Sequence, residues 1–483
     1  MNGTTLAAVS SPRRTTQNDP SSAEPGAARP REPVPGLVRI FAADQPRCDV
    51  LPLQGAAIEI GRDAFPEVPV DDAQMSRRHT SVRREGSLWH VEDLDSMNGT
   101  SVDGERLTGP RSGALRLVRA GSSLFLIQDD VEPFRAGVST IGGVMLGPTL
   151  VRVWDAIGRA ARFGPILHIH GESGTGKEHA ARAFHGLGPR SGGPFIAVNC
   201  AAIPEGLAER LLFGARKGAF SGATADVEGY VQAAHGGVLF LDEVAELDLA
   251  VQAKLLRALE SKEVMPLGAA RPVKVDFAVV SATHKDLRAQ VAAGKLRADL
   301  FFRIARPEIR LPTLHERPEE IPWLVGAALR SAGASGAGAE PLLAHASLIE
   351  ACLARAWPGN VRELLSEIGA AAQEARSAGS RWVQAAHLSP SAGQAFGVAS
   401  MPPASQSGLA SMPPTPRSAK DAAEPSPLEK RAVTLPADEV IEEALRREGG
   451  NISRAARALG LHRTQLNRWR ARRSGGGEPG SKE

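Results

Sequence analysis

The sequence predicts a multidomain chain with an all-β domain, an α/β domain that carries a helical subdomain, and a final all-α domain. Three observations support this prediction. Short β-like runs separated by turns fill residues 36–133, which is typical of a β-sandwich. Strand-like runs such as PILHIHG, GVLFLDE and VDFAVVSAT alternate with helical patterns over residues 138–310, as in a parallel α/β sheet. Residues 311–388 and 436–473 show helical patterns.

Length and composition limit the possible classes of protein. A chain of 483 residues has room for roughly three domains. Lys and Arg total 57 against 54 Asp and Glu, so the overall charge favours no partner. The cysteines, Cys48, Cys200 and Cys352, have neither disulfide-framework nor metal-site spacing, which favours a reduced, cytoplasmic setting. No apolar run approaches the ~18 residues of a membrane span, and the N-terminus lacks the apolar core of a signal peptide.

Three segments are expected to lack a folded core. Residues 1–35 hold no aromatic residue and are rich in Pro, Ser and Thr, which predicts a disordered tail. Residues 389–435 are Ser/Pro-rich and repeat the sequence ASMPP, which predicts a linker extended in part by its prolines. Residues 474–483 form a second short tail.

A glycine-rich segment lies between a predicted strand and a predicted helix, with phosphate-loop spacing. Glycines let backbone N–H groups surround phosphates, and a helix N-terminus favours anions. Lys177 is expected to reach the outer phosphates, whereas Glu178 stands where the general pattern has a hydroxyl ligand for Mg²⁺. The alternative, a strand–helix turn that binds nothing, is disfavoured by a lysine at this spacing. The candidate nucleotide-binding residues are Gly171, Glu172, Ser173, Gly174, Thr175, Gly176, Lys177 and Glu178.

The apolar strand GGVLFLDE ends in two carboxylates. Asp242 suits a Mg²⁺ ligand, direct or through water, and Glu243 suits polarisation of an attacking water. The alternative is a solvated strand end, which the upstream phosphate loop makes less attractive.

Three arginines fit phosphoryl chemistry. Arg297 and Arg303 lie six apart in LRADLFFRI, and a neighbouring subunit can donate such arginines to a transition state. Arg362, in WPGNVREL, is expected early in a helix, where it can sense a γ-phosphate. For all three arginines, ordinary ion pairing is an equally good explanation.

The segment KGAFSGATADVEG places an aromatic residue, Phe220, at the centre of a glycine-rich loop. Such a loop can be tucked onto its own domain, or it can be a tip that contacts another molecule.

The motifs GESGTGKE, GAFSGA, GGVLFLDE, LRADLFFRI and WPGNVREL occur in this order. Over about residues 138–375 they resemble the AAA+ central domain of sigma-54-dependent transcriptional activators. The resemblance implies an AAA+ P-loop ATPase with a helical lid, which assembles as a hexameric or heptameric ring. ATP hydrolysis, with Mg²⁺, between subunits would remodel the closed complex of sigma-54 RNA polymerase.

The same resemblance implies further site residues. Asn199 in VNCAAI would restrain the catalytic Glu243, and Thr283 and His284 would lie at the sensor I strand end. Phe220 would be the aromatic contact to sigma-54, although Ser221 stands where the family usually has Thr and Gln232 where Glu is common. The segment that leads into this loop, LLFGARKG, is also more basic than the ELFGHEKG that is usual in the family. The implied sigma-54 contact residues are Gly218, Ala219, Phe220, Ser221, Gly222 and Ala223.

Arginine, serine and asparagine residues gather at predicted loops of the β domain, and such groups bind a phosphopeptide from several sides. The pattern resembles a forkhead-associated (FHA) domain over about 36–130, which implies phosphothreonine binding and a Ser/Thr kinase as the input. The implied contacts are Arg62 and Ser76 to phosphate, Asn98 to the peptide and Arg77 as an extra contact, with His79 supporting the loop. The alternative is a sandwich that has lost its ligand and is retained for packing or dimer contacts. One hypothesis for the ligand is the chain's own phosphorylated Thr15, Thr16 or Thr415.

The C-terminal helical pattern is strongly basic, with seven arginines and no acidic residue from Gly449 to Gly477. It resembles a Fis-type helix–turn–helix, which implies paired binding to a palindromic DNA site. The alternative is a solvated basic tail. The expected DNA contacts are His462, Arg463, Thr464, Gln465, Asn467 and Arg468.

Together these resemblances indicate a sigma-54-dependent activator with a phosphopeptide sensor, in place of an aspartate receiver. Two rivals remain. One is an AAA+ machine with a different client, with the C-terminal segment as a nonspecific tether. The other is a pure binding regulator with an inactive ATP site, against which Lys177, Asp242 and Glu243 argue.

Overall fold

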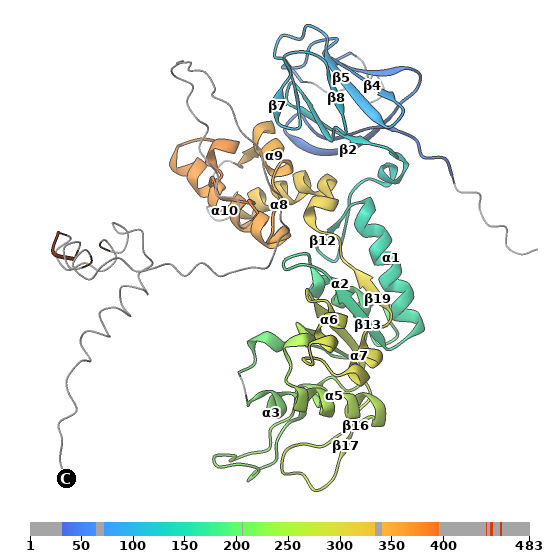
Figure 1. The fold of residues 1–483 in the computed structure, drawn as a ribbon, viewed down its shortest axis with the longest axis vertical. Coiled ribbons are helices and arrows are strands. Elements are labelled where there is room, and N and C mark those ends of the chain that lie inside the picture. The colour runs from blue at the N-terminus through green and yellow to red at the C-terminus, as the bar shows by residue number, and fades with distance from the viewer. Residues whose placement is uncertain are drawn as a thin grey trace, which may run out of the picture. The chain divides into compact units, whose positions relative to one another are not determined.

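The computed structural model describes residues 31–63, 72–204, 206–333 and 341–395, together with residues 441, 445–447 and 455. The chain divides into two compact units at residue 400. The first unit contains a β-sandwich, a parallel α/β subdomain and a helical lid, which run from blue through green to orange in Figure 1. The predicted DNA contacts at 462–468 lie outside the described residues, as do most of the predicted linker and tails. Among the described residues, no helix is both long and apolar enough to cross a bilayer.

The N-terminal sandwich consists of two antiparallel sheets, which confirms the predicted all-β fold. One sheet has six strands in the order β2-β1-β10-β9-β6-β7, and the other has four in the order β3-β4-β5-β8. The strands are β1 (Gly36–Ala42), β2 (Gln45–Pro52), β3 (Ala57–Ile60), β4 (Thr80–Glu85), β5 (Leu88–Asp93), β6 (Thr100–Val102), β7 (Glu105–Arg106), β8 (Arg111–Gly113), β9 (Leu117–Ala120) and β10 (Ser123–Gln128). Leu37, Val82, Trp89 and Phe125 belong to the apolar core between the sheets.

The central subdomain is built on a parallel sheet in the order β14-β15-β18-β13-β19, as predicted for an α/β fold. A hairpin and helix α1 precede the sheet. The strands are β11 (Ser139–Ile141), β12 (Val144–Leu146), β13 (Ile166–His170), β14 (Phe195–Asn199), β15 (Val238–Asp242), β16 (Glu263–Val264), β17 (Val273–Lys274), β18 (Ala278–Thr283) and β19 (Glu308–Arg310). The helices are α1 (Pro148–Phe163), α2 (Lys177–Leu187), α3 (Ala208–Phe213), α4 (Tyr230–Ala233), α5 (Leu249–Ser261), α6 (Leu287–Ala292) and α7 (Ala298–Ile304).

Both faces of this sheet are covered, which explains why its central strands are continuous apolar runs. All six residues of β18 are buried. Phe240 of β15 belongs to a cluster with Phe184 of α2, and Leu241 belongs to another with Leu255 of α5. The carboxyl ends of these strands therefore form a rigid edge at which functional side chains can be held.

The described part of the lid contains the α-helices α8 (Ile321–Gly333), α9 (Ala346–Leu353) and α10 (Asn360–Ser377). The sequence predicted helices over 311–388, and the structure adds a short parallel pair, β20 (Leu343–Ala344) and β21 (Trp382–Val383). The indole of Trp357 is buried and donates a hydrogen bond to the Cys352 carbonyl at 2.7 Å. Since α10 begins directly after this anchored turn, its first residues are fixed beside the α/β subdomain.

Candidate nucleotide site and phosphopeptide loops

A cavity of about 520 Å³ lies between the α/β subdomain and the lid. Its walls include the glycine-rich loop, the ends of β14 and β15, and residues of α8 and α10. Six of the predicted nucleotide-binding residues line it, namely Ser173, Gly174, Thr175, Gly176, Lys177 and Glu178, and they are joined by Asn199, Asp242, Glu243 and Arg362. Residues predicted from four separate motifs are therefore brought together in one place.

The glycine-rich loop packs directly against the start of the lid. A Cβ on Gly174 would lie 2.0 Å from the carbonyl oxygen of Gly359, and φ of Gly174 is +76°. The side chain of Asn360 donates hydrogen bonds to the Glu172 carboxylate and to the Ser173 carbonyl, both at 3.0 Å. The shape of the loop thus depends on the lid as well as on its own glycines.

The ammonium group of Lys177 is nearly buried at the first turn of α2, with the side chain 8% exposed. It donates to the carbonyl of Gly171 at 3.1 Å and lies 3.4 Å from the carboxylate of Glu243. A buried ammonium held between backbone carbonyls and one carboxylate is a positive charge available to an anionic ligand at this helix N-terminus.

The two carboxylates that end β15 have different environments. Burial raises the pKa of Asp242 above its ordinary value, against the opposing effect of the Lys177 charge. Burial also acts to raise the pKa of Glu243, but hydrogen bonds from His284 and Thr283 and the Lys177 charge outweigh it, so this pKa is lowered. Glu243 has a left-handed backbone, with φ +52°, which is uncommon for a non-glycine residue and often marks a functional position.

The side chain of Glu243 is oriented by the end of β18. The Thr283 hydroxyl donates to it at 2.9 Å, and its Oε2 lies 2.9 Å from Nδ1 of His284. Asn199, which was predicted to restrain Glu243, lines the same cavity, and its side-chain oxygen accepts from the Ala201 N–H at 3.0 Å. Among the described residues, Thr283 and His284 donate hydrogen bonds to the carboxylate of Glu243, a role that the sequence did not assign to them.

Two further residues of the site were missed from the sequence. Arg317 is buried, pairs with Glu320 at 2.8 Å and donates to the carbonyl of Thr175 at 2.9 Å. Glu320 also accepts a hydrogen bond from the N–H of Gly147 at 2.8 Å, and burial raises its pKa to about 7. Both line the cavity. The sequence signal was the charged run HERPEE before α8, a pattern that would equally fit a solvated helix start.

Arg362 of α10 does reach the glycine-rich loop. Its guanidinium donates to the Ser173 hydroxyl at 3.1 Å. Glu178 instead pairs with Arg182, one turn further along α2, at 2.7 Å. The carboxylate of Asp242, the last residue of β15, also lines the cavity and is an oxygen donor that suits Mg²⁺.

The other two predicted arginines do not line this cavity. Arg297 is exposed, pairs with Asp299 at 2.8 Å and immediately precedes α7. Arg303 lies in the last turn of the same helix and donates to the Leu259 carbonyl at 3.2 Å. Between them the ring of Phe302 is 76% exposed. Arg297, Phe302 and Arg303 are therefore all exposed on the surface of the chain near α7.

The loop at 218–223 forms a closed turn. The Gly218 N–H donates to the Ala223 carbonyl at 2.9 Å, and the Ala223 N–H donates to the Phe220 carbonyl at 3.0 Å. The Phe220 ring is 40% exposed and lies over the guanidinium of Arg210, with 5.2 Å from Cζ to the ring centroid. The structure thus shows the loop tucked onto α3, the first of the two interpretations of its sequence.

The predicted phosphopeptide residues lie on neighbouring loops at one end of the sandwich. The Arg62 N–H donates to the Ser76 carbonyl at 3.0 Å. A Cβ on Gly61 would lie 1.9 Å from the Arg77 carbonyl oxygen, so only glycine allows these two loops to approach so closely. Asn98 donates to the Gln74 carbonyl at 2.7 Å.

His79 supports these loops from beneath, as expected. It is fully buried, its Nδ1 accepts from the Ser76 N–H at 3.0 Å, and its Nε2 lies 3.2 Å from the Gly99 carbonyl. The Ser76 hydroxyl oxygen accepts from the Met97 N–H at 3.1 Å, which leaves its proton available to a ligand. Arg77 is exposed and lies 3.9 Å from the carboxylate of Asp63.

Comparison with protein families identifies three domains in the predicted order. Residues 58–116 match the FHA domain, residues 145–310 match the sigma-54 interaction domain, and residues 438–471 match the bacterial regulatory protein, Fis family. The chain therefore combines an FHA domain, a sigma-54 interaction domain of the AAA+ P-loop fold and a Fis-type helix–turn–helix.

Individual relatives match about half of the chain. The response regulator protein PilR of Pseudomonas aeruginosa is 48% identical over 218 residues, which are 45% of this chain and 48% of PilR. The DNA-binding transcriptional regulator NtrC of Salmonella typhimurium is 42% identical over 251 residues, 52% of this chain and 53% of NtrC. The structure of NtrX from Brucella abortus in complex with ATP is 29% identical over 66% of each chain, with a TM-score of 0.46. The chain thus spans about half the length of the curated relatives it matches.

Proposed function

We propose that the protein is a sigma-54-dependent transcriptional activator whose AAA+ domain hydrolyses ATP to remodel the closed complex of sigma-54 RNA polymerase. The observation that carries this proposal is the cavity that joins Lys177, Asp242, Glu243 and Arg362 within a domain that matches the sigma-54 interaction domain. Specific DNA, bound through the Fis-type domain, would supply the promoter location. A ring of six or seven copies would supply complete catalytic sites.

Each side chain has a defined part in the proposed hydrolysis. Lys177 and the loop N–H groups bind phosphate oxygens, and Arg362 senses the outer phosphate from the lid. Glu243 polarises the attacking water, and its lowered pKa keeps it ionised and able to accept a hydrogen bond from that water. Asp242 would hold Mg²⁺, directly or through water, and the ion would neutralise charge on the phosphate oxygens when bound.

Arg297 and Arg303 complete the site in trans under this proposal. This role is supported by the position of the two arginines. They lie outside the cavity of their own chain and come before and after the exposed Phe302 in the sequence. An arginine donated across a subunit boundary stabilises transition-state charge. ATP turnover would then require assembly.

The FHA domain is proposed to bind phosphothreonine and thereby control the ATPase. The support is the arrangement of Arg62, Ser76 and Asn98 on adjacent loops that His79 holds in place. The input would be a Ser/Thr kinase. A phosphorylated protein partner, or the chain's own Thr15, Thr16 or Thr415, would supply the ligand.

The discriminating experiment compares the purified protein with its Phe220→Ala variant. The variant should hydrolyse ATP at the parent rate but fail to form open complexes at a sigma-54 promoter, because Phe220 is not among the residues that line the nucleotide cavity. Equal promoter opening by both proteins would indicate an AAA+ machine with a different client. Absence of phosphate release from the parent would indicate a binding regulator with an inactive ATP site.

A further inference from the structure

One face of the larger sandwich sheet is buried although it points away from the other sheet. An antiparallel sheet in a two-layer sandwich normally alternates buried and solvated residues. Strands β4 and β5 do alternate. All seven residues of β1 are buried instead, and so are five of the six residues of β10. Another element must therefore cover the outer face of β1 and β10.

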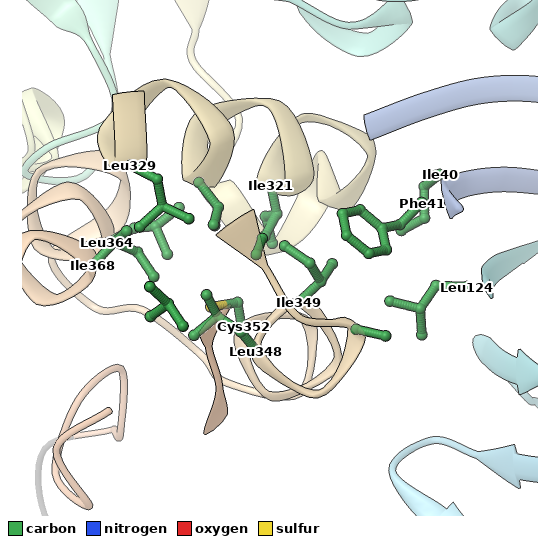
Figure 2. Packing of buried hydrophobic residues seen from close by; sticks show 14 of the residues in the cluster. Ile40, Phe41, Leu124, Ile321, Leu329, Leu348, Ile349, Cys352, Leu364 and Ile368 are labelled. Carbon is green, nitrogen blue, oxygen red and sulfur yellow. The ribbon is translucent and has the colours of Figure 1, made fainter. Parts of the chain in front are cut away.

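The lid of the same chain provides this cover. Phe41 of β1 and Leu124 of β10 belong to one apolar cluster with Ile321 of α8 and Ile349 of α9. Figure 2 shows Phe41 and Leu124 directed toward these lid residues from the sandwich. Phe41 is 1% exposed, which is a large apolar burial for a residue outside the sandwich core. The sandwich and the lid thus share one core.

Polar contacts fix the orientation of this interface. Nη1 of Arg119 lies 2.7 Å from the carboxylate of Glu350, and the two side chains are 24% and 13% exposed. At a second point Nη1 of Arg116 lies 2.8 Å from Nε2 of His315. The partly buried Arg119–Glu350 pair adds specificity to an apolar contact, because any other docking angle leaves its two charges unpaired.

Helix α8 connects the interface to the nucleotide cavity. Gly326 faces Pro46 of β2, whereas Leu324 and Ala327 line the cavity. At the start of the helix, Glu320 holds Arg317, which donates to the glycine-rich loop. A shift of the sandwich against α8 therefore moves a wall of the nucleotide site.

The other end of the connection reaches the phosphopeptide loops. Asp72 is buried and accepts hydrogen bonds from the N–H of Ser122, in the β9–β10 turn, at 3.0 Å and from the hydroxyl of Ser123, which begins β10, at 2.9 Å. Its other oxygen accepts from the Gln74 N–H at 3.0 Å, and the Gln74 carbonyl accepts from Asn98. The loop that carries Asn98 is thus linked to the hairpin that carries Arg119.

We propose that the FHA domain docks in cis on the lid through the outer face of β1, β9 and β10. Docking holds α8 in place. A phosphopeptide bound at the FHA loops would therefore change the affinity of the cavity for nucleotide. This second part rests on the phosphothreonine binding proposed above, whereas the docking itself does not. Coupling between two sites of one protein typically changes affinity by about 5–150-fold, and it acts equally in both directions.

The test uses the full-length protein with Gly326→Arg and the matched control Gly326→Ala. A Cβ at this position would lie 3.6 Å from Cγ of Pro46, so a methyl group fits whereas a long side chain collides with the sandwich. Both substitutions favour the helix relative to glycine. Amide hydrogen exchange is measured over 36–42, 123–128 and 346–353, together with the Kd for ADP.

In Gly326→Arg, exchange in the three segments should become faster and ADP affinity should fall by about five-fold or more. Gly326→Ala should match the parent. Unchanged exchange in Gly326→Arg would overturn the docking, and faster exchange with unchanged ADP affinity would overturn the coupling. Neither readout uses sigma-54 or a phosphopeptide, so failure here is distinct from failure of the proposed function.

A charge-swap cycle tests the same interface without a steric change. Arg119→Glu and Glu350→Arg should each accelerate exchange in these segments, because each places like charges together. The double variant should restore the slower exchange by reversing the pair. If exchange in the double variant were faster by the sum of the two single effects, the two side chains would not meet in solution. That result would overturn the docked arrangement.

Discussion

The hydroxyl of Thr283, at the end of β18, donates a hydrogen bond of 2.9 Å to the carboxylate of Glu243, which directly follows β15. The two strands are neighbours in the parallel sheet, so the sheet itself sets this contact. With His284 on the same carboxylate oxygen, Glu243 is held from one side and left open toward the cavity. Its direction is thus fixed before any substrate enters.

Replacing Thr283 should change the pH dependence of ATP hydrolysis. Hydrogen bonds from Thr283 and His284 lower the pKa of Glu243, so the base is lost only as the pH falls through this lowered value. Thr283→Val removes one donor and should move the acid limb of the pH–rate profile to higher pH. Turnover should also fall about 10-fold or more, since a hydrogen bond to a charged group contributes about 1.5–3 kcal/mol.

Thr283→Ser is the matched control because it keeps the hydroxyl. Its acid limb should coincide with that of the parent. If the Val and Ser variants had the same acid limb, the Thr283 hydroxyl would not determine the protonation of Glu243.

Gly174→Ala should abolish nucleotide binding. Its methyl group would lie 2.0 Å from the Gly359 carbonyl oxygen, at a φ that favours glycine, so the glycine-rich loop and the lid would be forced apart. Gly186→Ala, in α2, meets no atom within 4 Å and should bind normally, with a helix more stable by about 1 kcal/mol. Equilibrium binding of ADP to the three proteins checks this. Parent-like affinity in Gly174→Ala would show that the close approach is unimportant.

The contact between Arg210 and Phe220 should limit the motion of the 218–223 loop. A cation–π contact at a partly exposed site is worth about 0.5–1 kcal/mol, so Arg210→Ala should speed amide exchange in the loop about two- to five-fold. Arg210→Lys keeps the positive charge and should lie between the parent and Arg210→Ala. If Arg210→Ala left amide exchange in the loop unchanged, the Phe220 ring would be held by other contacts.

Ser76 and His79 should respond differently to substitution. Ser76→Ala should lose affinity for a phosphothreonine peptide while the domain stays folded, since the hydroxyl is partly exposed. His79→Ala should destabilise the domain by about 1–3 kcal/mol, because the buried N–H of Ser76 loses its acceptor. Thermal unfolding and peptide titration of both variants separate the two effects. A stable His79→Ala variant would contradict the supporting role.

Short-range patterns predicted most of the fold and of the nucleotide site. The glycine-rich loop, the pair Asp242–Glu243 and the start of α10 each follow from spacing within one motif. Arg317 and Glu320 escaped prediction because their function depends on contacts with Thr175 and Gly147, which are distant in the sequence. Asn199 was assigned by resemblance, and its local backbone contact could not be read from the sequence.

The burial of β1 and the position of Phe220 show a second limit of the sequence. The run LVRIF predicts a strand but does not show what covers its outer face, because a lid helix some 280 residues later provides the cover. The sequence of the 218–223 loop allowed both a tucked and an extended aromatic ring. The structure places the ring beside the guanidinium of Arg210, a contact that the sequence does not predict.

Retention of sigma-54 in the presence of ADP and aluminium fluoride is the most direct test of the proposed activator. Purified parent protein with this transition-state mimic should bind sigma-54 during size-exclusion chromatography, and Phe220→Ala should not. Parent protein that assembles and hydrolyses ATP, yet never retains sigma-54 under these conditions, would contradict the account.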